Sequence, residues 1–160
     1  MNEADLRFLR RCVELAELAL DKGDQPFGSV LVSADGVALN EGHNEVSGGD
    51  QTRHPEFMLA RWAAGHLTPA ERAAATVYTS GEHCAMCAAA HAWVGLGRIV
   101  YASSTEQLVA WRTELGAPAA PVRALAINEV APGVPVEGPV PELAEQVREL
   151  HRRYAARHPA

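Results

Sequence analysis

Hydrophobic side chains recur every three or four positions over residues 2–22, a spacing typical of one face of an amphipathic helix. Asn2 is a candidate N-cap for this helix, and Gly23 follows directly after it. Cys12 lies near the apolar face, and we expect it to be a small core residue, as most free cysteines are. The chain is therefore predicted to begin with a helix that packs on the rest of the protein.

Short runs of apolar and β-branched residues predict five strands. Two of them, at 29–32 and 37–39, form a hairpin about a turn at 34–36, and the others are expected at 76–80, 98–102 and 122–127. Helical patterns lie between them and after them, at 54–64, 84–96, 105–115 and 142–157, with a short capped turn from residue 68. Residues 131–141 hold four prolines and two glycines, and we expect an extended crossing that stays outside the sheet.

Strands that alternate with helices late in the chain imply parallel pairing there, whereas the early hairpin is antiparallel. The expected fold class is therefore α/β, a three-layer α/β/α sandwich with a mixed five-stranded sheet. A chain of 160 residues is long enough for one domain with its own core, so residues 1–160 are treated as a single domain.

The net charge of −6 argues against nucleic acid as the main partner, because proteins that bind polyanions usually carry basic surface. No apolar run reaches the ~18 residues that a membrane span needs, and the charged N-terminus does not have the pattern of a signal peptide. The 3 cysteines are then expected to be reduced thiols in the cytoplasm.

The candidate chemistry is carried by His54 and Glu56 together with Cys84 and Cys87. One imidazole and two thiolates can hold zinc and leave its fourth position open, as catalytic zinc requires. Glu56 follows the histidine by two residues, so on a helix it faces a different direction from the ligand. A carboxylate placed there can take a proton from water at the metal and deliver it to a leaving group.

Two plainer interpretations use the same residues. The two cysteines alone fit a redox pair, although such pairs usually follow the first strand of a thioredoxin-like unit. Alternatively, His54 and the two cysteines form a structural zinc site, which would leave Glu56 without a role; the candidate fourth ligands are His43, His83 and Cys12.

The pattern H-x-E followed by P-C-x-x-C is the signature of zinc deaminases, and the chain resembles the cytidine deaminase-like superfamily. It is most similar to guanine deaminases and bacterial tRNA adenosine deaminases. Two positions depart from the motif: His83 stands in place of proline, and Pro55 stands where most relatives have alanine. The resemblance implies an α/β/α sandwich and a zinc-activated hydroxide that attacks an amino-bearing ring carbon.

The same resemblance implies substrate contacts. Asn44 and Phe27 match a substrate-binding amide and a residue of the ring pocket, and Trp93 matches an aromatic position near the site. Glu114, with Trp111, is a candidate for an acid and an aromatic residue that guanine-type members place after the strand ending at residue 102. Relatives of this type also close the site with their C-terminal segment, so residues 142–160 are a candidate cap.

The sequence thus predicts a zinc-dependent hydrolytic deaminase of a free base or nucleoside, with guanine as the first candidate and one zinc ion per chain. A tRNA adenosine deaminase, a deaminase of cytosine or another amino-heterocycle, and a non-catalytic zinc-stabilised module are the alternatives. We also expect a homodimer that uses the alanine-rich helix at 84–96. Tyr154 and His151 are candidates for the pocket mouth, and the plainer alternative is that Tyr154 only packs its helix onto the body.

Overall fold

A computed structural model of the protein describes residues 1–159. The helices are α1 (Glu3–Asp21), α2 (Pro55–His66), α3 (Pro69–Ala74), α4 (Ala85–Trp93), α5 (Thr105–Glu114), α6 (Ile127–Val130) and α7 (Pro141–Arg157). The strands are β1 (Gly28–Val32), β2 (Ala38–His43), β3 (Thr76–Gly81), β4 (Ile99–Ser103) and β5 (Val136–Glu137). Within the described residues, no helix has the length and apolar character that crossing a membrane would need.

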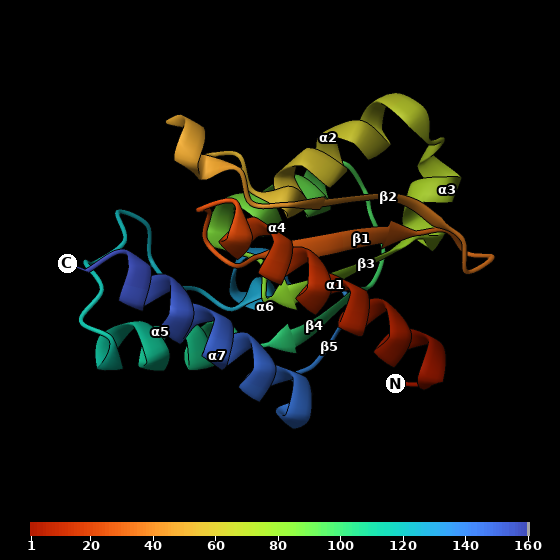
Figure 1. Ribbon diagram of the computed structural model, residues 1–160. Coiled ribbons are helices and arrows are strands. Elements are labelled where there is room, and N and C mark those ends of the chain that lie inside the picture. The colour runs from red at the N-terminus through yellow and green to blue at the C-terminus, as the bar shows by residue number, and fades with distance from the viewer. Residues whose placement is uncertain (160) are drawn as a thin grey trace.

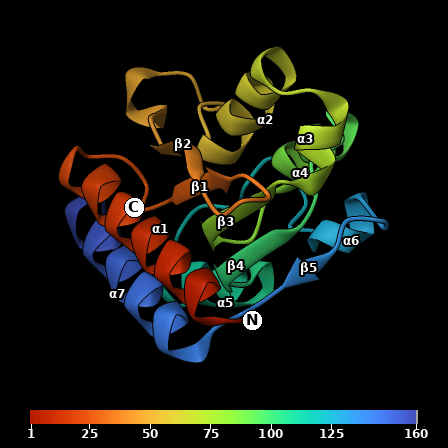
Figure 2. The same ribbon diagram turned by 90° about the vertical axis from the view of Figure 1, so that its right-hand side faces the viewer.

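The strands form one mixed sheet in the order β2-β1-β3-β4-β5. β1 pairs antiparallel with both β2 and β3, whereas β4 is parallel to β3 and to β5. Helices cover both faces: α1, α5 and α7 lie on one side of the sheet, and α2, α3 and α4 lie on the other (Figures 1 and 2). The predicted α/β sandwich with a mixed five-stranded sheet is therefore confirmed.

The two faces of the sheet carry separate hydrophobic cores. The larger core lies between the sheet and α1, α5 and α7, and it includes Leu9, Cys12, Val30, Val100 and Val147, each fully buried. The core on the other face joins α2 to β1 and β3. The last helix is part of the main core, because its residues Leu143, Ala144 and Val147 are buried in it.

A buried carboxylate ties the first helix to the sheet. Asp5 Oδ1 accepts hydrogen bonds from Tyr78 Oη at 2.7 Å and from Arg98 Nη1 at 2.9 Å. Asp5 Oδ2 accepts from Arg98 Nη2 at 3.1 Å and from the backbone N–H of Asn2 at 2.8 Å, which completes a capping box. Arg98 also pairs with Glu137 of β5, so one guanidinium links α1, β4 and β5.

The fifth strand is not where the sequence predicted it. Residues 122–126 form no strand, and Ile127 begins the short helix α6. The sheet is completed by Val136–Glu137, inside the proline-rich segment that was expected to stay outside it. A two-residue edge strand accommodates flanking prolines, since Pro135 contributes only its carbonyl, which accepts from Ile99 N–H at 2.9 Å.

The helix predicted at 84–96 also ends earlier, at Trp93. Gly95 adopts a left-handed backbone with φ 76°, which turns the chain out of the helix. Gly97 then passes so close to the chain at 73–75 that a Cβ on it would clash with the carbonyl oxygens of Ala73 and Ala75. β2 runs to His43, four residues beyond the strand predicted at 37–39, whereas α1, α2, α3, α5, α7 and the other early strands lie close to where the pattern predicts them.

Candidate active site

Three metal-ligating side chains meet at the starts of two helices. His54 is the N-cap residue of α2 and Cys84 is the N-cap residue of α4, with Cys87 one turn further along α4. The two helices pack against each other, and the ligating atoms of these residues all lie within 4.8 Å of one another. His54 Nδ1 is 3.5 Å from Cys84 Sγ and 3.6 Å from Cys87 Sγ.

These separations suit zinc. With Zn–N of about 2.0–2.1 Å and Zn–S of about 2.3 Å, a tetrahedral ion separates its nitrogen and sulfur ligands by roughly 3.6 Å. Both nitrogen–sulfur distances match that value. Three protein ligands of this kind leave a fourth position open, as in catalytic zinc sites. The residues therefore fit a zinc ion without rearrangement.

The electrostatics of the cluster favour a thiolate. Hydrogen bonds from Cys87 and from His54 lower the pKa of Cys84 to about 4. The pKa of His54 is raised, chiefly by its hydrogen bond to Cys84. Cys84 also stands at the positive end of the α4 dipole, which stabilises negative charge. A thiolate is the form of cysteine that binds metal.

Glu56 lies in the first turn of α2, and only 7% of its surface is exposed. Its Oε1 accepts hydrogen bonds from Ser29 Oγ at 3.0 Å and from Thr79 Oγ1 at 2.8 Å. Burial raises the pKa of this carboxyl, and the hydrogen bond from Thr79 opposes that shift. The charge of His54 lowers the pKa and the charge of Cys84 raises it. A carboxyl group poised in this way beside a metal cluster is suited to proton transfer.

Phe27 and Asn44 lie at the open end of the hairpin, directly before β1 and directly after β2. Asn44 donates its backbone N–H to the carbonyl of Phe27 at 3.0 Å, and its side-chain Oδ1 accepts from Val46 N–H. The Phe27 ring rests against Gly81, where a Cβ would approach a ring carbon to 3.2 Å. Gly81 ends β3 three residues before Cys84, so the Phe27 ring contacts the segment that leads to the cluster.

Three other predicted site residues are not brought to the cluster. Trp93 is 89% exposed and lies nine residues along α4 from Cys84, about 13 Å at 1.5 Å per residue. Glu114 is exposed and pairs with Arg148 at 2.9 Å. Tyr154 packs against the hydrophobic cluster of Ala16, Leu20 and Leu150, and its ring stacks on His158.

His83, which stands where the motif has proline and was a candidate fourth ligand, is only 1% exposed. Its ring lies edge-to-face with His91, at 5.5 Å between centroids, and neither ring nitrogen has a hydrogen-bond partner among residues 1–159. His91 in turn makes a 2.7 Å hydrogen bond to the carbonyl of Gly97. His83 is not part of the metal-ligating group, so its imidazole fills core space behind the start of α4.

Sequence reasoning missed two residues that touch this region, Ser29 and Thr79, and it named a third, His151, with Tyr154 as a candidate for the pocket mouth. Ser29 and Thr79 hold Glu56, and His151 of α7 lies 5.2 Å from the Phe27 ring and 5.9 Å from that of Trp111. His151 had been paired with Tyr154, yet it alone reaches Phe27. Ser29 and Thr79 did carry a signal, because each is a polar residue within a strand that is buried along nearly its whole length.

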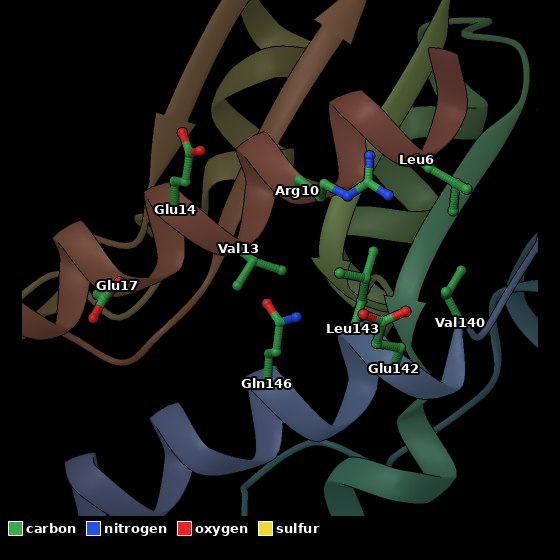
Figure 3. Close-up of a pocket in the computed structure, with 9 residues that line it drawn as sticks. All are labelled: Leu6, Arg10, Val13, Glu14, Glu17, Val140, Glu142, Leu143 and Gln146. Carbon is green, nitrogen blue, oxygen red and sulfur yellow. The ribbon is translucent and has the colours of Figure 1, made fainter. Parts of the chain in front are cut away.

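A separate groove of about 360 Å³ lies between α1 and α7, on the opposite side of the sheet from the cluster. Figure 3 shows side chains of both helices lining it, among them Val13, Leu143 and Gln146. None of its lining residues belongs to the cluster, so the groove is distinct from the candidate active site.

The family model for the cytidine and deoxycytidylate deaminase zinc-binding region matches residues 2–103, which include the whole cluster. The chain belongs to this family. Its cofactor is accordingly zinc, and the residues positioned to bind it are His54, Cys84 and Cys87.

Individual relatives differ in what they act on. A probable cytosine deaminase of Schizosaccharomyces pombe is 35% identical over 111 residues, 68% of this chain and 66% of its own length. A guanine deaminase of Bacillus subtilis is 37% identical over 98 residues, 60% of this chain and 62% of its own length. A tRNA-specific adenosine deaminase of Haemophilus influenzae is 32% identical over 104 residues, 64% of this chain and 60% of its own length. The chain thus spans less than two thirds of the length of each of these relatives.

Among solved structures, the guanine deaminase from Nitrosomonas europaea superposes with a TM-score of 0.73 at 22% identity, covering 93% of this chain and 83% of that one. At this identity the likeness supports the fold alone. A tRNA:A34 deaminase structure gives a TM-score of 0.54 at 28% identity and covers 62% of this chain and 76% of that one.

Proposed function

We propose that the protein is a zinc-dependent hydrolytic deaminase of a free nucleobase or nucleoside, with guanine-type purines as the first candidates. The observation that carries this proposal is the placement of a buried carboxylate, Glu56, beside three ligands with tetrahedral zinc spacing. Membership of a deaminase family supports the reaction class.

When bound, zinc lowers the pKa of water toward about 7 and so provides a nucleophile at neutral pH. In the proposed mechanism the Glu56 carboxylate takes the proton that this water loses. It gives this proton to a ring nitrogen as the amino-bearing carbon is attacked, then takes the remaining proton of the added hydroxyl group and gives it to the departing amine. Water and the amino compound are thereby converted to an oxo-base and ammonia.

We assign substrate contacts to Phe27 and Asn44. The Phe27 ring offers an apolar face to a flat heterocycle, and the Asn44 amide, held by Val46 N–H at 3.1 Å, offers polar contacts at the ring edge. The side chain of Asn44 is buried, so its orientation is fixed before a substrate arrives. The positions of Trp93, Glu114 and Tyr154 support no such assignment.

A small substrate is favoured over RNA because the chain carries a net charge of −6, and RNA binding draws much of its affinity from phosphate contacts with Lys and Arg. The relatives named for tRNA keep RNA as the second candidate. A gel-shift assay with tRNA at two salt concentrations separates the two: tight, salt-sensitive binding would favour the RNA substrate.

The test of the proposal is an ammonia-release screen of the zinc-loaded protein over guanine, cytosine, adenine, triazines and the corresponding nucleosides. Glu56→Ala should keep its zinc and lose at least ~100-fold in turnover, the scale of a general acid–base contribution. A control variant, Glu71→Ala, removes an exposed carboxylate of α3 and should retain full activity. A zinc-loaded protein that deaminates none of these compounds would instead indicate a non-catalytic module.

We also propose that the protein forms a homodimer through α2 and α4. Met58 of α2 is 38% exposed and Trp93 of α4 is 89% exposed. The two helices pack against each other. Large exposed apolar side chains of this kind are typical of interaction surfaces. Light scattering at micromolar concentration should give twice the chain mass, and Trp93→Glu should shift the mass toward the monomer. A monomeric wild-type protein would contradict the proposal.

A further inference from the structure

The Glu56 carboxylate is held by hydroxyl groups from two different strands. Ser29 of β1 and Thr79 of β3 both reach Oε1, at 3.0 Å and 2.8 Å, and both residues are fully buried. Their own hydroxyl oxygens lie 2.9 Å apart. A buried side-chain hydroxyl rarely lies in a core without a partner, and Glu56 is a shared partner of these two.

The two hydroxyl groups have two hydrogens for four short contacts, since Thr79 Oγ1 is also 2.9 Å from the carbonyl oxygen of Gly81. Both hydrogens can therefore point toward Glu56 when it is a carboxylate. When the carboxyl group carries a proton on Oε2, its Oε1 can still accept from both hydroxyl groups. Either arrangement keeps the carboxyl group in the same place.

The hydrogen bonds from Ser29 and Thr79 go to the same oxygen of the Glu56 carboxyl group. Among residues 1–159, no side chain donates a hydrogen bond to Glu56 Oε2, whereas Oε1 receives two. One oxygen is thus anchored to the sheet while the other is left for exchange with a reactant. Glu56 follows His54, the N-cap residue of α2, by two residues in the first turn of that helix, which places it near the metal-ligating residues.

We propose that Ser29 and Thr79 are positioning residues, which hold Glu56 by one oxygen so that the other faces the reacting groups. This inference rests on the proposed function, because Glu56 must transfer protons for its orientation to matter. Residues that orient a catalytic group typically change activity by about 10–100-fold when they are mutated, and a displacement of about 1 Å can cost ~100-fold.

The variants Thr79→Val and Ser29→Ala each remove a hydroxyl with little change in shape, and Thr79→Ser keeps the hydroxyl and removes only a methyl group. We expect Thr79→Val and the double variant to lower kcat by about 10–100-fold and to leave KM within about two-fold, with zinc content unchanged. Thr79→Ser should restore most of kcat. Ser103→Ala is the matched control, because the buried Ser103 hydroxyl donates to the carbonyl of Ser80 and not to Glu56.

A second measurement does not depend on turnover. Thermal unfolding of the zinc-loaded protein should show that Thr79→Val lowers the midpoint in the wild-type background and lowers it less in a Glu56→Ala background. Such coupling is expected only for side chains that interact directly. Equal losses in the two backgrounds would overturn the inference.

The two proposals fail in different ways. If the wild type deaminates a base and Glu56→Ala does not, but Thr79→Val and Ser29→Ala keep full kcat, the positioning role is wrong and the proposed function stands. If Thr79→Ser loses as much kcat as Thr79→Val, the threonine acts through packing, and the inference is again wrong. If no compound is deaminated, the proposed function fails, and the thermal coupling still decides whether the hydroxyls hold Glu56.

Discussion

Replacing Asp5 by alanine should destabilise the protein far more than its place at the end of a surface helix suggests. Only 3% of Asp5 is exposed, and it accepts hydrogen bonds from Tyr78, from both terminal nitrogens of Arg98 and from Asn2 N–H. Removing one partner of a buried ion pair typically costs about 3–5 kcal/mol. Arg98 is 28% exposed and keeps Glu137, so we expect a loss of about 2–4 kcal/mol.

Urea unfolding of the zinc-loaded protein measures this loss. Glu3→Ala is the matched control, since Glu3 lies in the same first turn of α1 but its side chain is 80% exposed and meets only Arg10. The control should change the free energy of unfolding by no more than about 0.5 kcal/mol. If the two variants lose equal stability, the buried network does not contribute as argued.

The same carboxylate predicts a dependence of stability on pH. The hydrogen bonds from Arg98, followed by those from Tyr78 and Asn2, hold the pKa of Asp5 far below its usual range, although burial opposes them. An unfolded aspartate binds a proton near pH 3.9, so below about pH 4 the unfolded state binds more protons than the folded state. The contribution of Asp5 is thus present above pH 4 and is lost as the pH falls below it. Asp5→Asn should therefore lose less stability than the wild type between pH 5 and pH 3, and parallel losses would refute the assignment.

Two further predictions concern the metal and the tail. Cys84→Ser and Cys87→Ser should each lose zinc, because the site has three protein ligands, and full occupancy by metal analysis in both variants would reject the site. Deleting residues 142–160 should prevent folding, rather than open the active site, because Leu143, Ala144 and Val147 are buried in the main core. Circular dichroism checks this outcome, and a folded truncated protein would show that α7 is only a cap.

Local signals in the sequence predicted most of the helices and strands. Capping boxes at Asn2, Thr68 and Ser104 act within four residues, so they are readable from the chain alone. The metal-ligating residues are similarly local, since each half of the motif begins one helix. The starts of α2 and α4 were therefore predicted together with the chemistry they carry.

Features that depend on distant partners were predicted less well. Val136 and Glu137 form a strand only because Ile99 and Val100 lie beside them, and the prolines around them concealed this pairing. The exposure of Trp93 depends on where α4 stops, and the outward position of Glu114 depends on Arg148, 34 residues away. Nothing in the local pattern distinguishes these side chains from ones that face the pocket.

The hydroxyl pair beside Glu56 depends on a distant partner, but each of its residues also carries a local signal in the sequence. Ser29 and Thr79 are 50 residues apart, and the antiparallel pairing of β1 with β3 brings them opposite each other. No motif spans that distance, yet each residue is a polar side chain in a strand that is buried along nearly its whole length. A buried hydroxyl needs a hydrogen-bond partner, and in the structure the Glu56 carboxyl group is a partner of both. Polar residues in buried strands next to a catalytic motif are therefore the places where a sequence can indicate what orients the motif.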